Sequence, residues 1–140
     1  MPVLSPLTDT FIQARMHRDR RGSTPRMVVV HDMEAPERST MAEDLGRNWF
    51  ANPIDENGKL VYASTQYGAD SNSICGYVGE ERAAYGATTI SNNTGIHIEH
   101  AGYARQSRAE WLDWYGVAML DRTARLAADI CRRYRIPVVF

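Results

Sequence analysis

A histidine and a glutamate stand at two apolar stretches of this 140-residue chain, where they could do hydrolytic chemistry. His31 follows the β-branched run 28–30, and Glu99 lies inside the stretch 94–103. Apolar runs of this kind are typical of strands buried in a sheet. An imidazole can bind a divalent metal ion, and a nearby carboxylate can act as a base on the water that the metal activates. We therefore consider His31 and Glu99 a candidate metal-and-base pair.

Two further histidines lie on the same stretch as Glu99. Because side chains alternate along a strand, His97 shares a face with Glu99, and His100 points to the other face. His97 could approach a site on that face, but we interpret both histidines as ordinary strand residues. Asp32 and Glu34, in the loop after His31, either orient its ring or are simple loop carboxylates.

Composition and charge indicate a single globular domain and narrow the classes of partner. The chain is 44% hydrophobic and 24% charged, with a net charge of −1. That charge argues against nucleic acid as a partner, because phosphate binding needs an excess of Lys and Arg. No apolar run is long enough for a membrane span, and the N-terminus lacks the features of a secretory signal. We expect a monomer with no membrane association.

Residues 1–25 are expected to form an irregular arm, because proline and glycine interrupt them, and residues 26–140 to form the domain. An arginine-rich part of this arm is either solvated or a contact for an anionic surface. Hydrophobic periodicity predicts strands in the domain at 26–31, 60–70, 73–78 and 96–101. It predicts helices at 40–52 and from 107 to 135, a helical turn at 80–83, a small-residue loop at 86–93 and another strand from Val138. The mixture predicts an α/β fold with a central mixed β-sheet flanked by helices.

Four segments, in this order, resemble motifs of the zinc-dependent N-acetylmuramoyl-L-alanine amidases. That family includes phage endolysins and the animal peptidoglycan-recognition proteins. The four segments are 28–31 with its acidic loop, 63–70, 82–85 and 93–99. The segment at 99–106, which leads into 111–113, is most similar to the corresponding segment in endolysins of phages that infect mycobacteria. The resemblance covers residues 26–140 and implies an amidase/peptidoglycan-recognition-protein-like fold.

The resemblance also implies a reaction and a set of site residues. In the family, a zinc ion held by two His and one Cys or Asp activates water, which cleaves the amide between N-acetylmuramic acid and L-alanine. Carried over to this chain, His31 matches the first zinc ligand and Glu99 matches the catalytic glutamate. We assign Tyr85, in the loop expected to line the cleft, and Asn93, at the start of the last motif, to substrate binding. The implied partner is peptidoglycan or a muropeptide.

An endolysin would remain in the host cytoplasm until lysis and then degrade the cell wall. The family's other two zinc ligands follow the strand that begins here at Val138, so we expect the C-terminal part of the family domain to be missing. Two alternatives therefore remain open: a module that binds muropeptides without cleaving them, and a truncated fragment without a complete zinc site. A measurement of the zinc bound per chain would distinguish the enzyme from both alternatives.

Overall fold

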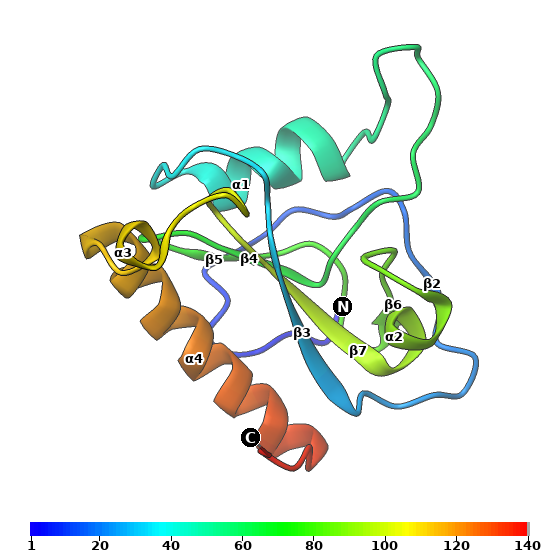
Figure 1. Cartoon of the computed structure of the whole chain (residues 1–140). Coiled ribbons are helices and arrows are strands. Elements are labelled where there is room, and N and C mark those ends of the chain that lie inside the picture. Colours follow the sequence, from blue (N-terminus) through cyan, green and yellow to red (C-terminus); the bar gives the residue numbers. More distant parts are fainter. Residues whose placement is uncertain (140) are drawn as a thin grey trace.

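A five-stranded mixed sheet organises the computed structural model, which describes residues 1–139 (Figure 1). In spatial order the strands are β1 (Thr10–Phe11), β5 (Ile74–Gly76), β4 (Tyr67–Ala69), β7 (Gly95–His100) and β3 (Met27–Asp32). The strands β4, β7 and β3 run parallel to one another, β5 is antiparallel to β4, and β1 is parallel to β5. The predicted central mixed sheet with flanking helices is confirmed.

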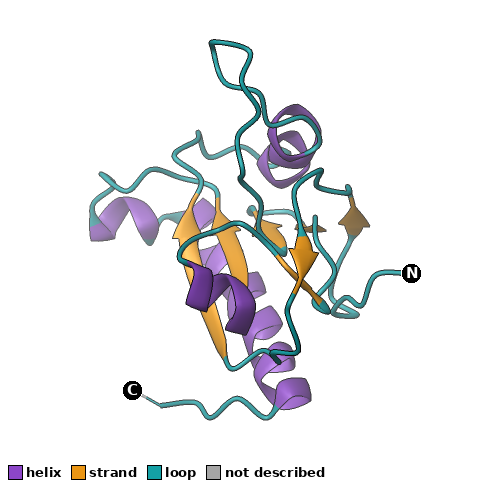
Figure 2. Cartoon of the chain, turned by 90° about the vertical axis from the view of Figure 1, so that its right-hand side faces the viewer, coloured by secondary structure: helices purple, strands orange, loops and turns teal. Residues whose placement is uncertain are grey.

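The long helix α4 (Trp114–Tyr134) covers one face of this sheet (Figure 2). Alternation along β7 turns Ile96 and Ile98 toward the helix, where they pack with Leu126 and Ile130 in one buried cluster. The Asp113 side chain caps the start of α4 by accepting a hydrogen bond from a backbone N–H in the first turn. The apolar stripe of α4 therefore holds β7 in place from one side.

The opposite face is covered by shorter elements. They are α1 (Met41–Leu45), its continuation as a π-type turn η1 (Gly46–Phe50), and α2 (Thr89–Thr94). Tyr77 is fully buried against α1 and η1, with its ring packed in a T-shaped contact with Phe50 and its hydroxyl donating to the Ala42 carbonyl. A small sheet of β2 (Arg18–Asp19) and β6 (Arg82–Ala83), and a short helix α3 (Arg108–Trp111), complete the described elements.

Several predicted elements are confirmed, with shifted bounds. The first strand occupies Met27–Asp32, the first helix spans α1 and η1, and the expected hairpin is formed by β4 and β5. Both hairpin strands are shorter than predicted, and residues 61–66, within the predicted first strand of the hairpin, form no strand. The long C-terminal helix is split into α3 and α4, since Asp113 starts a new helix instead of continuing the first.

Three local predictions were wrong. The predicted helical turn at 80–83 contains β6, which pairs with β2 from a distant part of the chain. Part of the predicted loop 86–93 is helix α2, which begins where the Thr88 side chain accepts a hydrogen bond from the Ser91 N–H. Residues 136–139 form no strand, and residue 140, the end of the predicted last strand, lies outside the described residues.

Residues 1–25 are mostly irregular, but they pack against the domain. They supply β1 at one sheet edge, and Arg20 is almost fully buried. The Arg20 guanidinium donates to the backbone carbonyls of Glu80, Asn93 and Gly95. Because the Asn93 carbonyl belongs to α2 and the Gly95 carbonyl to the start of β7, Arg20 helps to position the strand that carries Glu99.

A buried ionic group joins the far end of α4 to the loop before β6. Arg133 makes two contacts with the fully buried Glu80 carboxylate, at 2.5 and 2.7 Å, and a third with Asp129 at 2.8 Å. Tyr67 also donates to Glu80.

Among residues 1–139, no helix is both long and apolar enough to cross a membrane.

Candidate functional site

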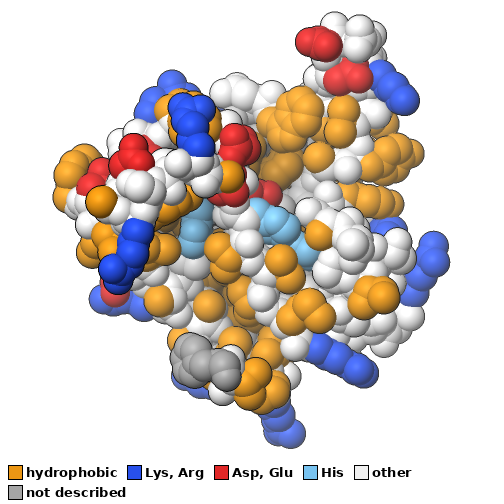
Figure 3. Space-filling view, in the orientation of Figure 1, with side chains coloured by type: hydrophobic (Ala, Val, Ile, Leu, Met, Phe, Trp, Pro, Cys, Tyr) orange, Lys and Arg blue, Asp and Glu red, His pale blue; other side chains and the backbone are white. Residues whose placement is uncertain are grey.

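The register of the sheet brings His31 and Glu99 together. In the parallel pairing of β3 with β7, His31 lies directly beside Glu99, and on the other side Glu99 lies beside Gly68 of β4. Side chains at paired positions of adjacent strands point to the same face. Figure 3 shows histidine and acidic side chains gathered near the centre of the face where Figure 1 places β3 and β7. The two residues singled out from the sequence therefore share one site.

Glu99 lines a cleft of about 170 Å³. Its Oε2 atom is buried and has no hydrogen-bond partner. Burial, with a smaller effect from the nearby Asp32 carboxylate, raises the pKa of Glu99 to about 8. A carboxyl group whose pKa lies near neutrality can both accept and release a proton under working conditions, as a general acid or base must. The walls of the cleft are formed by Asp32, Met33, Leu45, Trp49, Phe50, Ala63, Ser64, Thr65, Tyr85 and Gly86.

His31 is joined to His97, which the sequence analysis interpreted as an ordinary strand residue. The His31 Nε2 and His97 Nδ1 atoms are 2.9 Å apart, and the two ring planes differ by 15°. On its far side, His97 Nε2 lies 3.0 Å from the Ser91 carbonyl oxygen. Burial lowers the pKa of both imidazoles. Both rings are therefore neutral near pH 7, which is the protonation state that binds metal ions.

The two residues assigned to substrate binding lie in different places. Tyr85 lines the cleft. Its ring makes a T-shaped contact with the ring of Tyr62, with the ring centres 5.3 Å apart, and the Arg18 guanidinium lies 5.7 Å from the ring centre of Tyr85. Asn93 lies in α2 and does not line the cleft. Its backbone carbonyl accepts from Arg20, and its side-chain Oδ1 is buried without a partner. The structure thus brings Tyr85, but not Asn93, to the cleft of Glu99.

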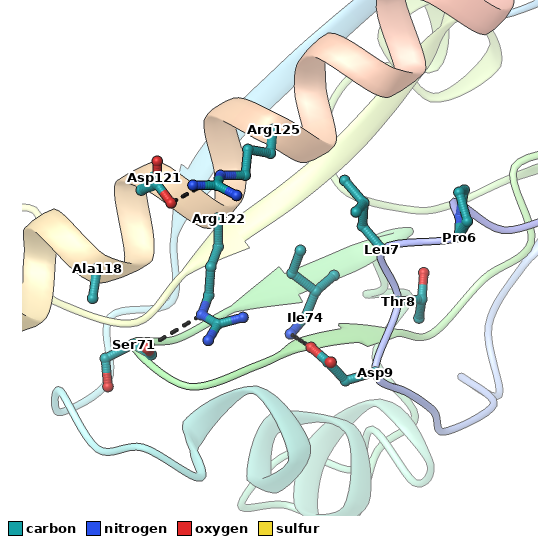
Figure 4. A pocket seen from close by; sticks show the side chains of 10 residues that line it. All are labelled: Pro6, Leu7, Thr8, Asp9, Ser71, Ile74, Ala118, Asp121, Arg122 and Arg125. Carbon is teal, nitrogen blue, oxygen red and sulfur yellow. Dashed lines mark hydrogen bonds and ion pairs between the residues drawn. The ribbon is translucent and has the colours of Figure 1, made fainter.

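A larger hollow of about 570 Å³ lies between α4 and the N-terminal segment (Figure 4). Its polar side chains are engaged within the protein: Arg122 donates to the Ser71 carbonyl, Arg125 pairs with Asp121, and Asp9 accepts from a backbone N–H. None of the buried side-chain atoms that lack a partner in residues 1–139 belongs to its lining. The smaller cleft is therefore the candidate functional site.

Among residues 1–139, the donor groups beside Glu99 do not make a complete metal site, and neither His31 nor His97 lines the cleft. Two imidazole nitrogens face each other, and an unpartnered carboxylate oxygen lies on the same face of the sheet. The part of the chain that the structure describes holds no cluster of three or more His, Cys, Asp or Glu side chains suited to a metal ion. The sequence analysis missed the contact between His97 and His31. Side-chain alternation along the strand could have indicated it, because it places His97 on the same face as Glu99.

Comparison with known proteins gives this geometry a context. Residues 21–139 match the protein family described as N-acetylmuramoyl-L-alanine amidase. A comparison with curated proteins found no match. These results concern sequence alone.

Three solved structures illustrate the similarity of the fold. A selenomethionine derivative of AmpD has a TM-score of 0.71 at 17% identity, covering 96% of this chain and 81% of that chain. A mutant endolysin from Bacillus subtilis has a TM-score of 0.65 at 14% identity, covering 93% and 79%. The Staphylococcus aureus hydrolase AmiA, solved in complex with its ligand, has a TM-score of 0.62 at 16% identity, covering 95% and 58%. The chain thus spans just over half of the AmiA chain, and identities this low show a shared fold alone.

Proposed function

The chain belongs to the N-acetylmuramoyl-L-alanine amidase family, and on this premise we propose that it hydrolyses the amide bond between N-acetylmuramic acid and L-alanine in peptidoglycan. One observation carries the proposal. Glu99, which has a buried oxygen without a partner, lines a cleft, and His31 lies beside Glu99 on the neighbouring strand. A buried carboxylate without a partner is costly to stability, so its retention in a cleft favours a chemical role.

In this proposal Glu99 moves the proton during hydrolysis. The carboxylate accepts a proton from the attacking water as its oxygen bonds to the lactyl carbonyl carbon, and it returns that proton to the nitrogen of L-alanine as the C–N bond breaks. Zinc, when bound at His31, supplies a Lewis acid for the carbonyl and lowers the pKa of water.

Aromatic side chains at the rim of the cleft are suited to hold a muropeptide. The cleft is too small for a whole disaccharide peptide, so most of the ligand must lie along its rim. Tyr85 and Tyr62 offer an apolar surface there, and Arg18 adds a positive charge next to Tyr85. A stem peptide carries carboxylates, which a guanidinium pairs with well. We propose that the protein acts on the bacterial cell wall as an endolysin-type enzyme.

The test is release of L-alanine-terminated peptide from a soluble muropeptide by the full chain supplied with zinc. New amino groups and the mass of the separated glycan and peptide report the bond that is cut. Glu99→Gln should lower the rate by about a hundredfold or more, because the proton acceptor is lost. The exposed Glu56 provides a matched control, and Glu56→Gln should leave the rate unchanged. An enzyme with zinc bound that releases no peptide would contradict the amidase proposal.

The alternative is a muropeptide-binding module without catalysis. It is favoured by the lack of a three-residue metal cluster among residues 1–139. Calorimetric titration with the same muropeptide distinguishes the two functions, since binding without any peptide release supports the module. Tyr85→Ala should weaken binding about tenfold in either case, because an aromatic contact of this kind contributes about 1 kcal/mol or more.

A further inference from the structure

We propose that His97 is a positioning residue for His31. In this assignment Nε2–H of His31 donates a hydrogen bond to Nδ1 of His97, which holds the His31 ring and leaves its lone pair on Nδ1. The inference rests on the proposed function only for the part that His31 plays in the reaction. The alignment of the two rings, the positions of their protons and the packing of His97 each support it.

The two imidazoles are aligned for a single hydrogen bond. The His31 Nε2 and His97 Nδ1 atoms are 2.9 Å apart, and the ring centres are 5.2 Å apart. This is close to the largest centre separation that such a contact allows, so the line between the two nitrogens runs nearly through both ring centres. An N–H bond and a lone pair both point outward from the centre of an imidazole. The donor and the acceptor therefore face each other directly, which is the geometry of a well-formed hydrogen bond.

The direction of this hydrogen bond follows from the other side of His97. The Ser91 carbonyl oxygen lies 3.0 Å from His97 Nε2 and can only accept, so Nε2 carries a proton. A second proton, on Nδ1, would make the fully buried ring a cation. Burial, together with the neighbouring Arg20 guanidinium, opposes that charge and lowers the pKa of His97. Nδ1 of His97 therefore accepts, and Nε2 of His31 donates.

The same reasoning places the proton on His31. A neutral imidazole carries one proton, and His31 uses it on Nε2. Its lone pair then lies on Nδ1, and within residues 1–139 the ring makes no other hydrogen bond. From Nδ1, a neutral ring of this tautomer can accept a proton or bind an electrophile, but it cannot donate. Without its partner, the ring would exchange between both tautomers.

Packing holds the His97 ring in one place. The side chain is fully buried, and the His97 backbone N–H donates to the Gln66 side chain at 2.9 Å. A Cβ added at Gly86 would lie 2.8 Å from His97 Nδ1, and one added at Gly95 would lie 3.0 Å from Nε2. Both distances are shorter than ordinary Cβ contacts, so glycine at these two positions makes room for the ring.

Helix α2 anchors the far end of this chain of hydrogen bonds. Ser91 lies in α2, and its carbonyl oxygen also accepts from the Gly95 N–H at the end of the helix. Arg20 donates to the carbonyls of Asn93 and Gly95. The Ser91 carbonyl is thus part of a fixed segment of backbone. Its direction sets the orientation of His97 and, through His97, that of His31.

His31 lies where its free nitrogen could serve the reaction. Besides adjoining Glu99 in the sheet, it lines a hollow of about 350 Å³ beside β3 and α4. Asp32 lines both this hollow and the cleft of Glu99, so the two adjoin. A His31 ring that can only accept at Nδ1 leaves Glu99 to return the proton to the leaving nitrogen, as in the proposed hydrolysis.

Nitrogen-15 NMR of the histidine rings in the unmutated full chain, with a chelator present, tests the hydrogen bond directly. At about pH 8 imidazoles are neutral, and the shift of each ring nitrogen shows whether it carries a proton. We expect protons on Nε2 of both His31 and His97. We also expect a scalar coupling across the hydrogen bond, between His31 Nε2 and His97 Nδ1. The buried His100, which contacts Thr123 instead, should show no such coupling to either ring.

Two substitutions separate positioning from packing. His97→Leu removes the acceptor, so the nitrogen shifts of His31 should move toward values averaged over both tautomers. The kcat for muropeptide cleavage should fall about tenfold, with little change in KM. His97→Gln supplies one acceptor and one donor, as a neutral histidine does, and should recover most of that loss. His17 lies outside the site, near Arg82, so His17→Leu should match the wild type in both measurements.

Three results would each overturn the proposal. They are a wild type without the coupling between His31 and His97, a proton on Nδ1 of His31, and a folded His97→Leu variant that keeps the His31 shifts or the kcat of the wild type. The NMR measurements on the unmutated protein stand even if a variant fails to fold. They do not require amidase activity, so a protein that shows the coupling yet cleaves nothing refutes only the proposed function.

Discussion

Replacing Glu99 with glutamine should remove a large part of the pH dependence of stability in the metal-free protein. The carboxyl group has an ordinary pKa of 4.5, and burial raises it to about 8 in the fold. The fold therefore favours the neutral acid. The neutral Glu99 side chain contributes fully to stability at pH values below its pKa in the unfolded chain. This contribution is lost as the pH rises toward its pKa in the folded protein. Glutamine keeps the shape of the neutral acid and cannot ionise.

The size of the effect follows from the shift. Each pKa unit corresponds to about 1.4 kcal/mol, so the shift of Glu99 sets a ceiling of about 5 kcal/mol on the loss. The carboxyl group borders a cleft that water can enter, which reduces the cost of ionisation. We expect the free energy of unfolding of the wild type to fall by about 2 kcal/mol relative to Glu99→Gln between about pH 5 and about pH 8.

Urea unfolding followed by tryptophan fluorescence, in the presence of a chelator, measures this difference. The two proteins should be close in stability at the acidic end of the range and should diverge as the pH rises. Glu56→Gln, at an exposed position, should follow the wild type throughout. If the stabilities of the wild type and Glu99→Gln run parallel over the whole range, then Glu99 is not a carboxyl group held neutral by burial.

Two structural predictions test the elements that position the site. Arg133→Met should lower the free energy of unfolding by about 3 kcal/mol, because it leaves the buried carboxylate of Glu80 without its cation. The control is Arg125→Met, which breaks an exposed ion pair on the same helix and should lower the free energy of unfolding by less than about 1 kcal/mol. Urea unfolding measures both values. Gly68→Ala should lower the melting temperature measured by circular dichroism, because the added Cβ would lie 2.1 Å from the buried Tyr77 hydroxyl; an unchanged melting temperature would show that Tyr77 can move aside.

Local patterns in the chain were enough to predict the scaffold of the site. The β-branched run before His31 and the apolar alternation around Glu99 mark two strands because each is recognisable from its own residues. The helical periodicity after residue 107 predicts the helix that covers them. Four motifs in order then suggested the family, which the match over residues 21–139 confirms.

Contacts between distant segments account for what the patterns missed. The segment 80–83 contains a strand because residues 18–19 lie beside it, and residues 1–25 pack closely because Arg20 reaches carbonyl groups far along the chain. Neither partner can be recognised from the residues around it. A long-range pairing outweighs local propensity because backbone groups that become buried must find partners.

The sequence by itself determined which residues could do chemistry, namely His31 and Glu99 at the ends of recognisable strands, and which fold would carry them. Only the tertiary structure decided which side chains meet. It joined His31 to His97 at 2.9 Å, left the Glu99 oxygen unpartnered in a cleft, and kept Asn93 away from that cleft. The physical reason is that side-chain alternation assigns a face to each residue, whereas strand order and register, set by packing of the whole chain, assign its neighbours.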